Sequence, residues 1–275
     1  MLRLRYESGT GGATVELDGL DVGVGTADAL RGRAWSYTLG SRGISQVQRR
    51  AREVTVSLGV SDPAKQDLLR RVLDRDVQAG TPGELVYDGE WRTRAYGVKA
   101  EPQTLYRSYR AETLTLVLVD GIWRRATTAS YLPAASVGGD WLNYPHDYPM
   151  NYMATPAPQT VEGSAWAESP LRLTIFGPAV NPVVTIAGNR YAYDGTVPAG
   201  ARVVIDGLAK TVTEISVTGD EVNRFSSARR GGGLGSGEYC FQPLPPGVSS
   251  LAWPGTFGFD LTRWDEESEP PCTSS

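Results

Sequence analysis

The sequence predicts a mainly β protein with two domains, and three observations support this fold class. The chain has 275 residues, and at roughly 100–200 residues per domain two domains are expected. Its 32 glycines and 18 prolines favour turns and short strands over long helices. Apolar and polar residues alternate with a period of two along many short segments, which is typical of strands with one buried face. We therefore expect an α+β domain over residues 1–130 and an all-β domain over residues 161–265.

Short strands dominate the predicted N-terminal domain. Val54, Val56 and Leu58 alternate with polar residues, as expected for a half-buried strand. Asp88-Gly89 lies between two apolar runs and predicts a hairpin turn. A long strand is expected from about residue 106 to 119. Its leucines at 114, 116 and 118 would face the core, and Thr113 and Thr115 would face the other way. Strands, one helix and further strands indicate a domain dominated by antiparallel sheet.

One amphipathic helix is expected between these strands. Ser61 or Asp62 can cap its start, Pro63 suits its first turn, and Gly80 and Pro82 end it. The apolar residues of this segment recur at helical spacing and form one stripe, which we expect to face the core. They are Leu68, Leu69, Val72, Leu73 and Val77. The opposite face is charged and is either a subunit contact or, as we favour, a solvated surface; it consists of Arg70, Arg71, Asp74 and Arg75.

Residues 131–160 follow neither period and are rich in proline and aromatic residues. We interpret them as an ordered connector, because each proline restricts its own backbone and that of the residue before it. Large aromatic surfaces are unfavourable in a solvated linker and common where proteins meet. The connector either docks on a neighbouring subunit or packs within its own chain, and the residues expected to do so are Trp141, Tyr144, Pro145, Tyr148, Pro149 and Tyr152.

The C-terminal half contains about eight short strand candidates separated by turn signals such as Asp206-Gly207 and Gly219-Asp220. Regular spacing of this kind predicts a β-sandwich or jelly roll. One of these candidates covers residues 238–241 and includes Cys240. The last segment, residues 266–275, is acidic and rich in serine and proline, so we expect a disordered tail.

Residues able to perform chemistry are scarce. His146 is the only histidine and lies between prolines in the connector, so a catalytic triad has little support. Cys240 and Cys272 predict two unlinked thiols, and with a single histidine they do not suggest a zinc site. The glycine-rich segment 231–237 is not followed by the lysine of a phosphate-binding loop. We expect no enzyme activity, no metal and no cofactor.

Charge and hydropathy exclude further classes of protein. The net charge is −4, whereas proteins that bind nucleic acid tightly usually carry a net positive charge. No stretch approaches the roughly 20 apolar residues of a membrane span, and the first residues lack the apolar core of a signal peptide. We expect a soluble product, made in the cytoplasm of its host, without membrane insertion.

Several segments, in order along nearly the whole chain, resemble siphophage distal tail proteins. Residues 142–149 (LNYPHDYP) resemble the tyrosine-proline connector of that family. Residues 176–186, 203–207 and 243–251, together with Arg263-Trp264, resemble parts of its C-terminal domain. His146 and the glycine-rich segment 231–237 depart from the family pattern and leave their local structure open.

The resemblance implies a tail-tube-like N-terminal domain and a galectin-like C-terminal β-sandwich. Six copies would form a ring in the virion tail, between the tail tube protein and the tail-tip or tail-associated protein. DNA would pass through the lumen as cargo, with Thr113 and Thr115 as the expected lumen face. In some relatives the C-terminal domain also holds receptor-binding proteins.

Two alternatives belong to other classes of function. A carbohydrate-binding adhesion module is suggested by a sandwich that carries Trp166, Trp253 and Trp264, although a fold does not imply sugar binding. A cell-wall-degrading enzyme is disfavoured because the sequence offers no acid–base pair held on rigid elements.

Overall fold

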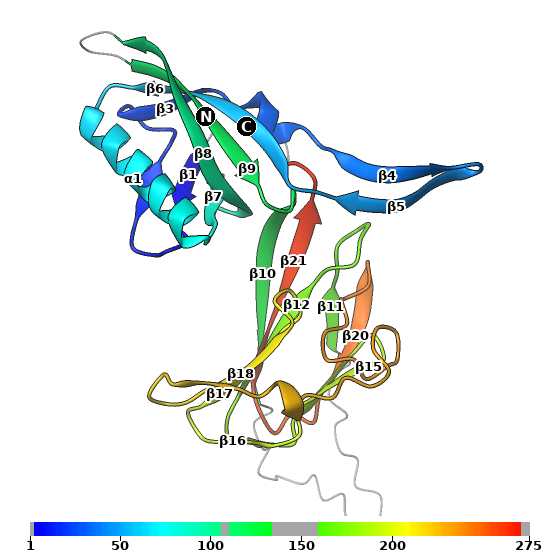
Figure 1. The fold of residues 1–275 in the computed structure, drawn as a ribbon. Coiled ribbons are helices and arrows are strands. Elements are labelled where there is room, and N and C mark those ends of the chain that lie inside the picture. The colour runs from blue at the N-terminus through cyan, green and yellow to red at the C-terminus, as the bar shows by residue number, and fades with distance from the viewer. Residues whose placement is uncertain (1–2, 106–109, 134–158, 271–275) are drawn as a thin grey trace, which may run out of the picture. The chain divides into compact units, whose positions relative to one another are not determined.

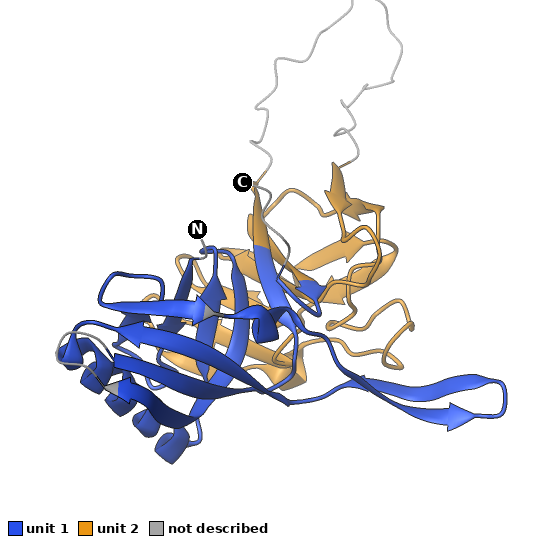
Figure 2. Cartoon of the chain, turned by 90° about the horizontal axis from the view of Figure 1, so that it is seen from above, with its two compact units in different colours: residues 1–126, 266–275 blue, residues 127–265 orange. Residues whose placement is uncertain are grey.

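A computed structural model describes residues 3–105, 110–133 and 159–270, which form two compact units. Unit 1 comprises residues 1–126 and 266–275, and unit 2 comprises residues 127–265 (Figure 2). The chain passes from unit 1 to unit 2 within strand β10 (Trp123–Tyr131) and returns within β21 (Phe259–Glu267). Unit 2 is therefore inserted into unit 1.

Unit 1 consists of one antiparallel sheet, one helix, a short 3-10 helix and a separate two-stranded hairpin (Figure 1). The described strands of the sheet follow the order β2-β1-β7-β8-β9-β6-β3, and β8 also pairs with the start of β10. Besides β10, the elements are β1 (Leu4–Glu7), β2 (Thr14–Glu16), β3 (Val22–Thr26), η1 (Asp28–Arg31), β4 (Trp35–Gly40), β5 (Gly43–Arg49), β6 (Arg52–Val60), α1 (Pro63–Ala79), β7 (Gly83–Tyr87), β8 (Trp91–Leu105) and β9 (Arg110–Leu118).

The sequence signals for the helix and the hairpin turn correspond to observed geometry. The Asp62 side chain accepts a hydrogen bond from the backbone N–H of Ala64 at 2.8 Å, and Pro63 occupies the first turn of α1. Gly80 ends the helix in the left-handed conformation that glycine adopts without steric cost. Asp88 and Gly89 both have positive φ, 51° and 78°, as the two central residues of a type I′ turn require, and the Glu90 N–H donates to the Tyr87 carbonyl across this turn at 3.2 Å.

The core of unit 1 lies between helix α1 and the sheet. Leu69, Val72 and Leu73 of the helix belong to the same buried cluster as the leucines of β9. Along β9, Leu114, Leu116 and Leu118 are buried, while the residues between them are partly exposed. This alternation follows from the two-residue period of a strand with one face on a core.

The predicted helix stripe is wrong at two positions. Leu68 is 41 % exposed and Val77 is 43 % exposed. Leu68 lies about 100° around the helix from Leu69, at the margin of the buried face. Gln66 and Asp76 complete that face instead, and both are buried with hydrogen-bond partners.

The charged face of α1 is not wholly solvated. Arg70 Nη2 lies 2.6 Å from Glu112 Oε2, and Gln66 Nε2 donates to the same oxygen at 2.7 Å. Glu112 is 2 % exposed, although it shares a strand face with three leucines. The long-range partners on α1 explain this burial, because a buried carboxylate needs hydrogen bonds and an opposite charge.

Unit 2 is a two-layer β-sandwich. One sheet has the order β19-β18-β17-β12-β21-β10, and the other has the order β11-β20-β14-β15. A small ladder pairs β13 with β16. The elements are β11 (Gln159–Glu162), β12 (Leu171–Phe176), β13 (Ala179–Val180), β14 (Val183–Ile186), β15 (Asn189–Ala192), β16 (Thr196–Val197), β17 (Arg202–Asp206), β18 (Thr211–Ile215), β19 (Glu221–Asn223), η2 (Phe225–Ser227) and β20 (Val248–Ala252).

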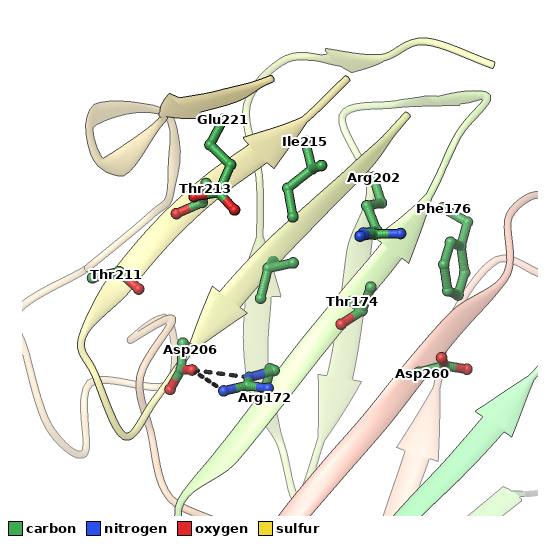
Figure 3. Close-up of a pocket in the computed structure, with 11 residues that line it drawn as sticks. Arg172, Thr174, Phe176, Arg202, Asp206, Thr211, Thr213, Ile215, Glu221 and Asp260 are labelled. Atoms are coloured by element: carbon green, nitrogen blue, oxygen red, sulfur yellow. Dashed lines mark hydrogen bonds and ion pairs between the residues drawn. The ribbon is translucent and has the colours of Figure 1, made fainter. Parts of the chain in front are cut away.

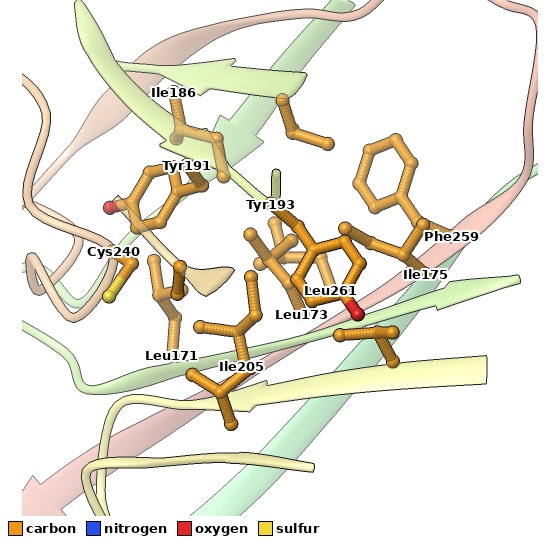
Figure 4. Packing of buried hydrophobic residues seen from close by; sticks show 14 of the residues in the cluster. Leu171, Leu173, Ile175, Ile186, Tyr191, Tyr193, Ile205, Cys240, Phe259 and Leu261 are labelled. Carbon is orange, nitrogen blue, oxygen red and sulfur yellow. The ribbon is translucent and has the colours of Figure 1, made fainter. Parts of the chain in front are cut away.

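The core of unit 2 is formed by apolar side chains from both sheets. Leu173 and Ile205 come from the larger sheet, Ile186 and Tyr191 come from the smaller one, and all four belong to one buried cluster (Figure 4). The observed strands and their antiparallel pairing confirm the mainly β fold class, with a single α-helix in the described residues.

Two expectations for the C-terminal half are corrected. Residues 238–241, expected as a strand, form no strand, and the buried Cys240 packs from a turn. Strand β21 continues to Glu267, beyond the start of the expected tail at residue 266. Glu266 is held there by Arg124, whose Nε lies 2.8 Å from Glu266 Oε1.

Candidate functional site

The solvent face of the larger sheet in unit 2 contains a depression of about 470 Å³ (Figure 3). It lies across β12, β17, β18, β19 and β21. Its lining combines charged, hydroxyl and apolar side chains: Arg172, Thr174, Phe176, Arg202, Val204, Asp206, Thr211, Thr213, Ile215, Glu221 and Asp260. The lining includes no histidine, cysteine or serine, so it offers a binding surface and none of these nucleophiles or bases.

Strand alternation explains how these side chains reach the depression. On β12, Leu171, Leu173 and Ile175 point into the sandwich core and are buried. Arg172 and Thr174 lie between them and therefore face the opposite side of the sheet. The same period applies on β17, where Arg202 lines the depression.

One arginine of the depression is already paired with a carboxylate. Arg172 donates to Asp206 Oδ2 from Nε at 2.9 Å and from Nη2 at 2.6 Å. The guanidinium of Arg172 also lies 5.0 Å from the ring centroid of Trp264. Asp206 Oδ1 accepts the backbone N–H groups of Leu208 and Ala209. This network holds the end of the sheet together and leaves Arg172 less able to bind an incoming anion.

A second exposed surface belongs to unit 1. Strands β4 and β5 form a hairpin that pairs with no other described strand. The sequence interpretation missed this hairpin, although its signal was present: Trp35, Tyr37 and Leu39 alternate with polar residues, and Gly40 and Gly43 flank the turn. The turn chemistry was the decisive clue, since glycines between alternating runs indicate a hairpin.

The candidate site residues predicted from the sequence do not come together in one described site. The connector residues Trp141, Tyr144, Pro145, Tyr148, Pro149 and Tyr152, and also His146, are outside the described residues. Thr113 and Thr115 are partly exposed on β9, on the side opposite its buried leucines. Neither threonine lines the depression in unit 2.

The three tryptophans behind the adhesion alternative differ in exposure. Trp264 is 9 % exposed and Trp166 is 82 % exposed. Trp253 packs against the core of unit 2, and its indole N–H donates to the carbonyl of Phe257 at 3.2 Å. Trp166 is therefore the most exposed of the three, whereas Trp253 is only partly exposed and Trp264 is buried.

Chemically reactive groups are few in the part of the chain that the structure describes. Cys240 is fully buried, and burial raises the pKa of its thiol to about 11, so it is a poor nucleophile near neutral pH. No group of three or more metal-binding side chains occurs among the described residues. Among the same residues, no helix is long and apolar enough to cross a membrane.

The fold defines a class of protein: a chain of two β-rich units, each with its own buried apolar cluster. No protein-family model and no curated protein matches the chain. Solved structures of a phage hub protein and of a phage baseplate do match it. The Dit protein of phage SPP1 (gp 19.1), described as a paradigm of the hub adsorption apparatus in phages infecting Gram-positive bacteria, aligns with a TM-score of 0.55 and 10 % identity, over 96 % of this chain and 99 % of that chain.

A chain of the phage P2 baseplate, in its activated conformation with calcium, aligns with a TM-score of 0.59 and 8 % identity, over 98 % of this chain and 100 % of that chain. The same baseplate with strontium gives the same values. At such low identity the likeness shows the fold alone. The expected resemblance to distal tail proteins is confirmed at the level of the fold, across both units.

Proposed function

We propose that this chain is a structural subunit of a bacteriophage tail tip and acts there without enzyme activity. The observation that carries this proposal is the extent of the likeness, which covers 96 % of this chain and 99 % of the SPP1 hub protein. A fold alone does not define a function. Here, however, a likeness that extends over nearly the whole length of both chains supports a shared role more strongly than one common domain would.

In the proposed assembly, six copies form a ring through unit 1. The sheet of unit 1 ends in β2, with three residues, and β3, with five. Exposed strand edges favour pairing with another chain, and closed symmetric rings are a common way for identical subunits to cover such surfaces. The ring joins the tail tube protein on one side to the tail-tip or tail-associated protein on the other.

DNA passes through the lumen of this ring as cargo. The chain carries a net charge of −4, which disfavours strong phosphate binding along the path. Thr113 and Thr115 are the proposed lumen face, because they are partly exposed and uncharged. The depression in unit 2 is the proposed seat of a receptor-binding protein, and the site of action is the virion tail.

The ring can be tested with the purified full chain, each copy having a mass of 29.7 kDa. We expect native mass spectrometry to give the mass of six chains and negative-stain images to show rings. Antibody labelling of virions should place the protein at the distal end of the tail. A protein that stays monomeric at high concentration and is absent from tail ends would refute the proposal.

The adhesion alternative is not proposed. It depended on exposed tryptophans, and Trp253 and Trp264 pack against the protein instead. A glycan array with the full chain remains a simple check, and we expect no retained glycan.

A further inference from the structure

The hairpin of β4 and β5, here called the β4–β5 arm (residues 35–49), projects from unit 1 without support from the sheet (Figures 1 and 2). Its two strands pair only with each other among the described strands. Strands of six and seven residues extend about 20 Å. A two-stranded hairpin by itself is only marginally stable in water, so an arm of this length needs a partner surface to hold one conformation.

The arm has two chemically different faces. Trp35 lies opposite Arg49, and Leu39 lies opposite Ile44, so each pair shares a face. The polar face is held by hydrogen bonds of Ser36 to Gln48, Thr38 to Gln46 and Ser45 to Thr38.

Side chains alternate between the two faces of a strand, and one extra residue in β5 near Gln46 shifts this alternation. As a result, every large apolar side chain of the arm lies on the other face. That face is uncovered in the single chain. The exposed fractions are 44 % for Trp35, 54 % for Tyr37, 75 % for Leu39, 59 % for Ile44 and 45 % for Val47. Single exposed apolar residues are ordinary, but a contiguous apolar patch marks an interaction surface.

Charge indicates what covers this face. Residues 29–52 hold six arginines and no acidic residue, so the segment carries +6. The other 251 residues hold 21 basic and 31 acidic side chains, which leaves them at −10. The arm and its base are therefore basic on an otherwise acidic protein, and the rest of a second copy of the chain carries the opposite net charge.

We propose that the apolar face of the β4–β5 arm docks on a second copy of this chain, and that its arginines pair with acidic side chains of that copy. The proposal rests on the proposed self-assembly of the chain and identifies the β4–β5 arm as the element that forms the contact between copies. The edge strands β2 and β3 are short, with three and five residues, and the arm adds five large apolar side chains to the surface available for self-association. A nucleic-acid duplex would attract the arginines but would leave Leu39, Ile44 and Val47 in water, so a protein surface fits better.

Variants of the full chain test the apolar contact. Leu39→Ser and Ile44→Ser should each weaken self-association by about tenfold or more, since each loses a large apolar contact. The matched control is Leu234→Ser, because Leu234 is 69 % exposed in unit 2 and its loss should leave association unchanged. Association is measured by light scattering over a concentration series. Thermal unfolding of the monomer should be equal for all variants, because these side chains are already exposed in the single chain.

The electrostatic part is tested with Arg42→Glu, at the tip of the arm. This variant should also weaken association, and added salt should weaken the wild type more than the variant. A photo-crosslinking amino acid in place of Tyr37 should link the arm to a second copy of the chain within the assembly.

The outcomes separate this inference from the proposed function. If the wild type forms rings and the arm variants form them equally well, the arm inference fails and the ring stands. A wild type that remains monomeric overturns both. Crosslinks only to a different protein, or a gel shift of duplex DNA that Arg42→Glu abolishes while association is unaffected, would overturn docking on a second copy.

Discussion

At the scale of single residues, Asp76 shows how unit 1 uses a buried charge. It accepts hydrogen bonds from the Tyr6 hydroxyl at 2.8 Å, from the Ser8 hydroxyl at 2.7 Å and from the Gly9 and Thr10 backbone N–H groups at 3.1 and 3.2 Å. Burial would raise the pKa of Asp76, but the hydrogen bonds from Ser8, Tyr6, Gly9 and Thr10 together outweigh it, and the pKa lies below its usual value. The ionised carboxylate therefore fastens the loop after β1 to the end of helix α1.

We predict that Asp76→Asn lowers the free energy of unfolding by about 1–3 kcal/mol at pH 7, because the amide cannot accept all these hydrogen bonds. A lowered folded-state pKa stabilises the protein above the unfolded value of roughly 3.9 and stops doing so as pH falls through the folded value. The difference between wild type and variant should therefore shrink near pH 3. Urea unfolding at both pH values measures it.

The control for this prediction is Asp74→Asn, since Asp74 is exposed on the same helix. It should change stability little at either pH. An Asp76→Asn difference of equal size at pH 7 and pH 3 would show that the charge of the carboxylate contributes nothing.

At the scale of elements, the sequence correctly predicted local structure wherever a single residue determines the backbone conformation. The cap at Asp62, the stop at Gly80 and the turn at Asp88-Gly89 depend on neighbours close in sequence. The burial of Glu112 could not be predicted, because its partners Gln66 and Arg70 lie more than 40 residues away in sequence. Leu68 was misassigned for the same reason: the tilt of a helix on its sheet is a long-range property.

Helix α1 approaches strand β8 closely at one glycine. A Cβ atom at Gly97 would lie 2.6 Å from Leu73 Cδ2 and 3.0 Å from Leu73 Cγ. We predict that Gly97→Ala destabilises unit 1 by about 1–3 kcal/mol through overpacking. Chemical denaturation measures the loss in the free energy of unfolding. Leu73→Ala should lower this free energy less in the Gly97→Ala background than in the wild type.

A strand glycine with more room provides the control. At Gly25 of β3 an added Cβ would meet nothing closer than 3.7 Å, so Gly25→Ala should be neutral or slightly stabilising. Equal losses for Gly97→Ala and Gly25→Ala would mean that the close approach of the helix has no energetic role.

At the scale of the whole molecule, each unit has its own buried apolar cluster. The all-β character of unit 2 could be predicted because its strands alternate strictly, as Leu171, Leu173 and Ile175 do on β12. The depression on its outer face could not be, because it forms where side chains from five strands meet. The connector residues lie outside the described part of the chain, so their proposed contacts stay predictions.

Two separate cores predict two unfolding transitions in scanning calorimetry. Ile205 is fully buried in unit 2, and Ile205→Ala should lower one transition, with a loss of about 2–5 kcal/mol. Asp76→Asn should lower only the other. A single transition that both variants shift equally would show that the units unfold together.

The insertion of unit 2 within unit 1 sets an order of events during synthesis. Arg124 forms ion pairs with Asp120 and with Glu266, and Glu266 leaves the ribosome only after all 139 residues of unit 2, numbered 127–265. Residues Phe259–Arg263 of the same strand pair with β12 in the sandwich, so strand β21 completes both units and neither is complete before this strand has been made. Translation therefore delays the completion of unit 1, which carries the β4–β5 arm, until strand β21 has been made.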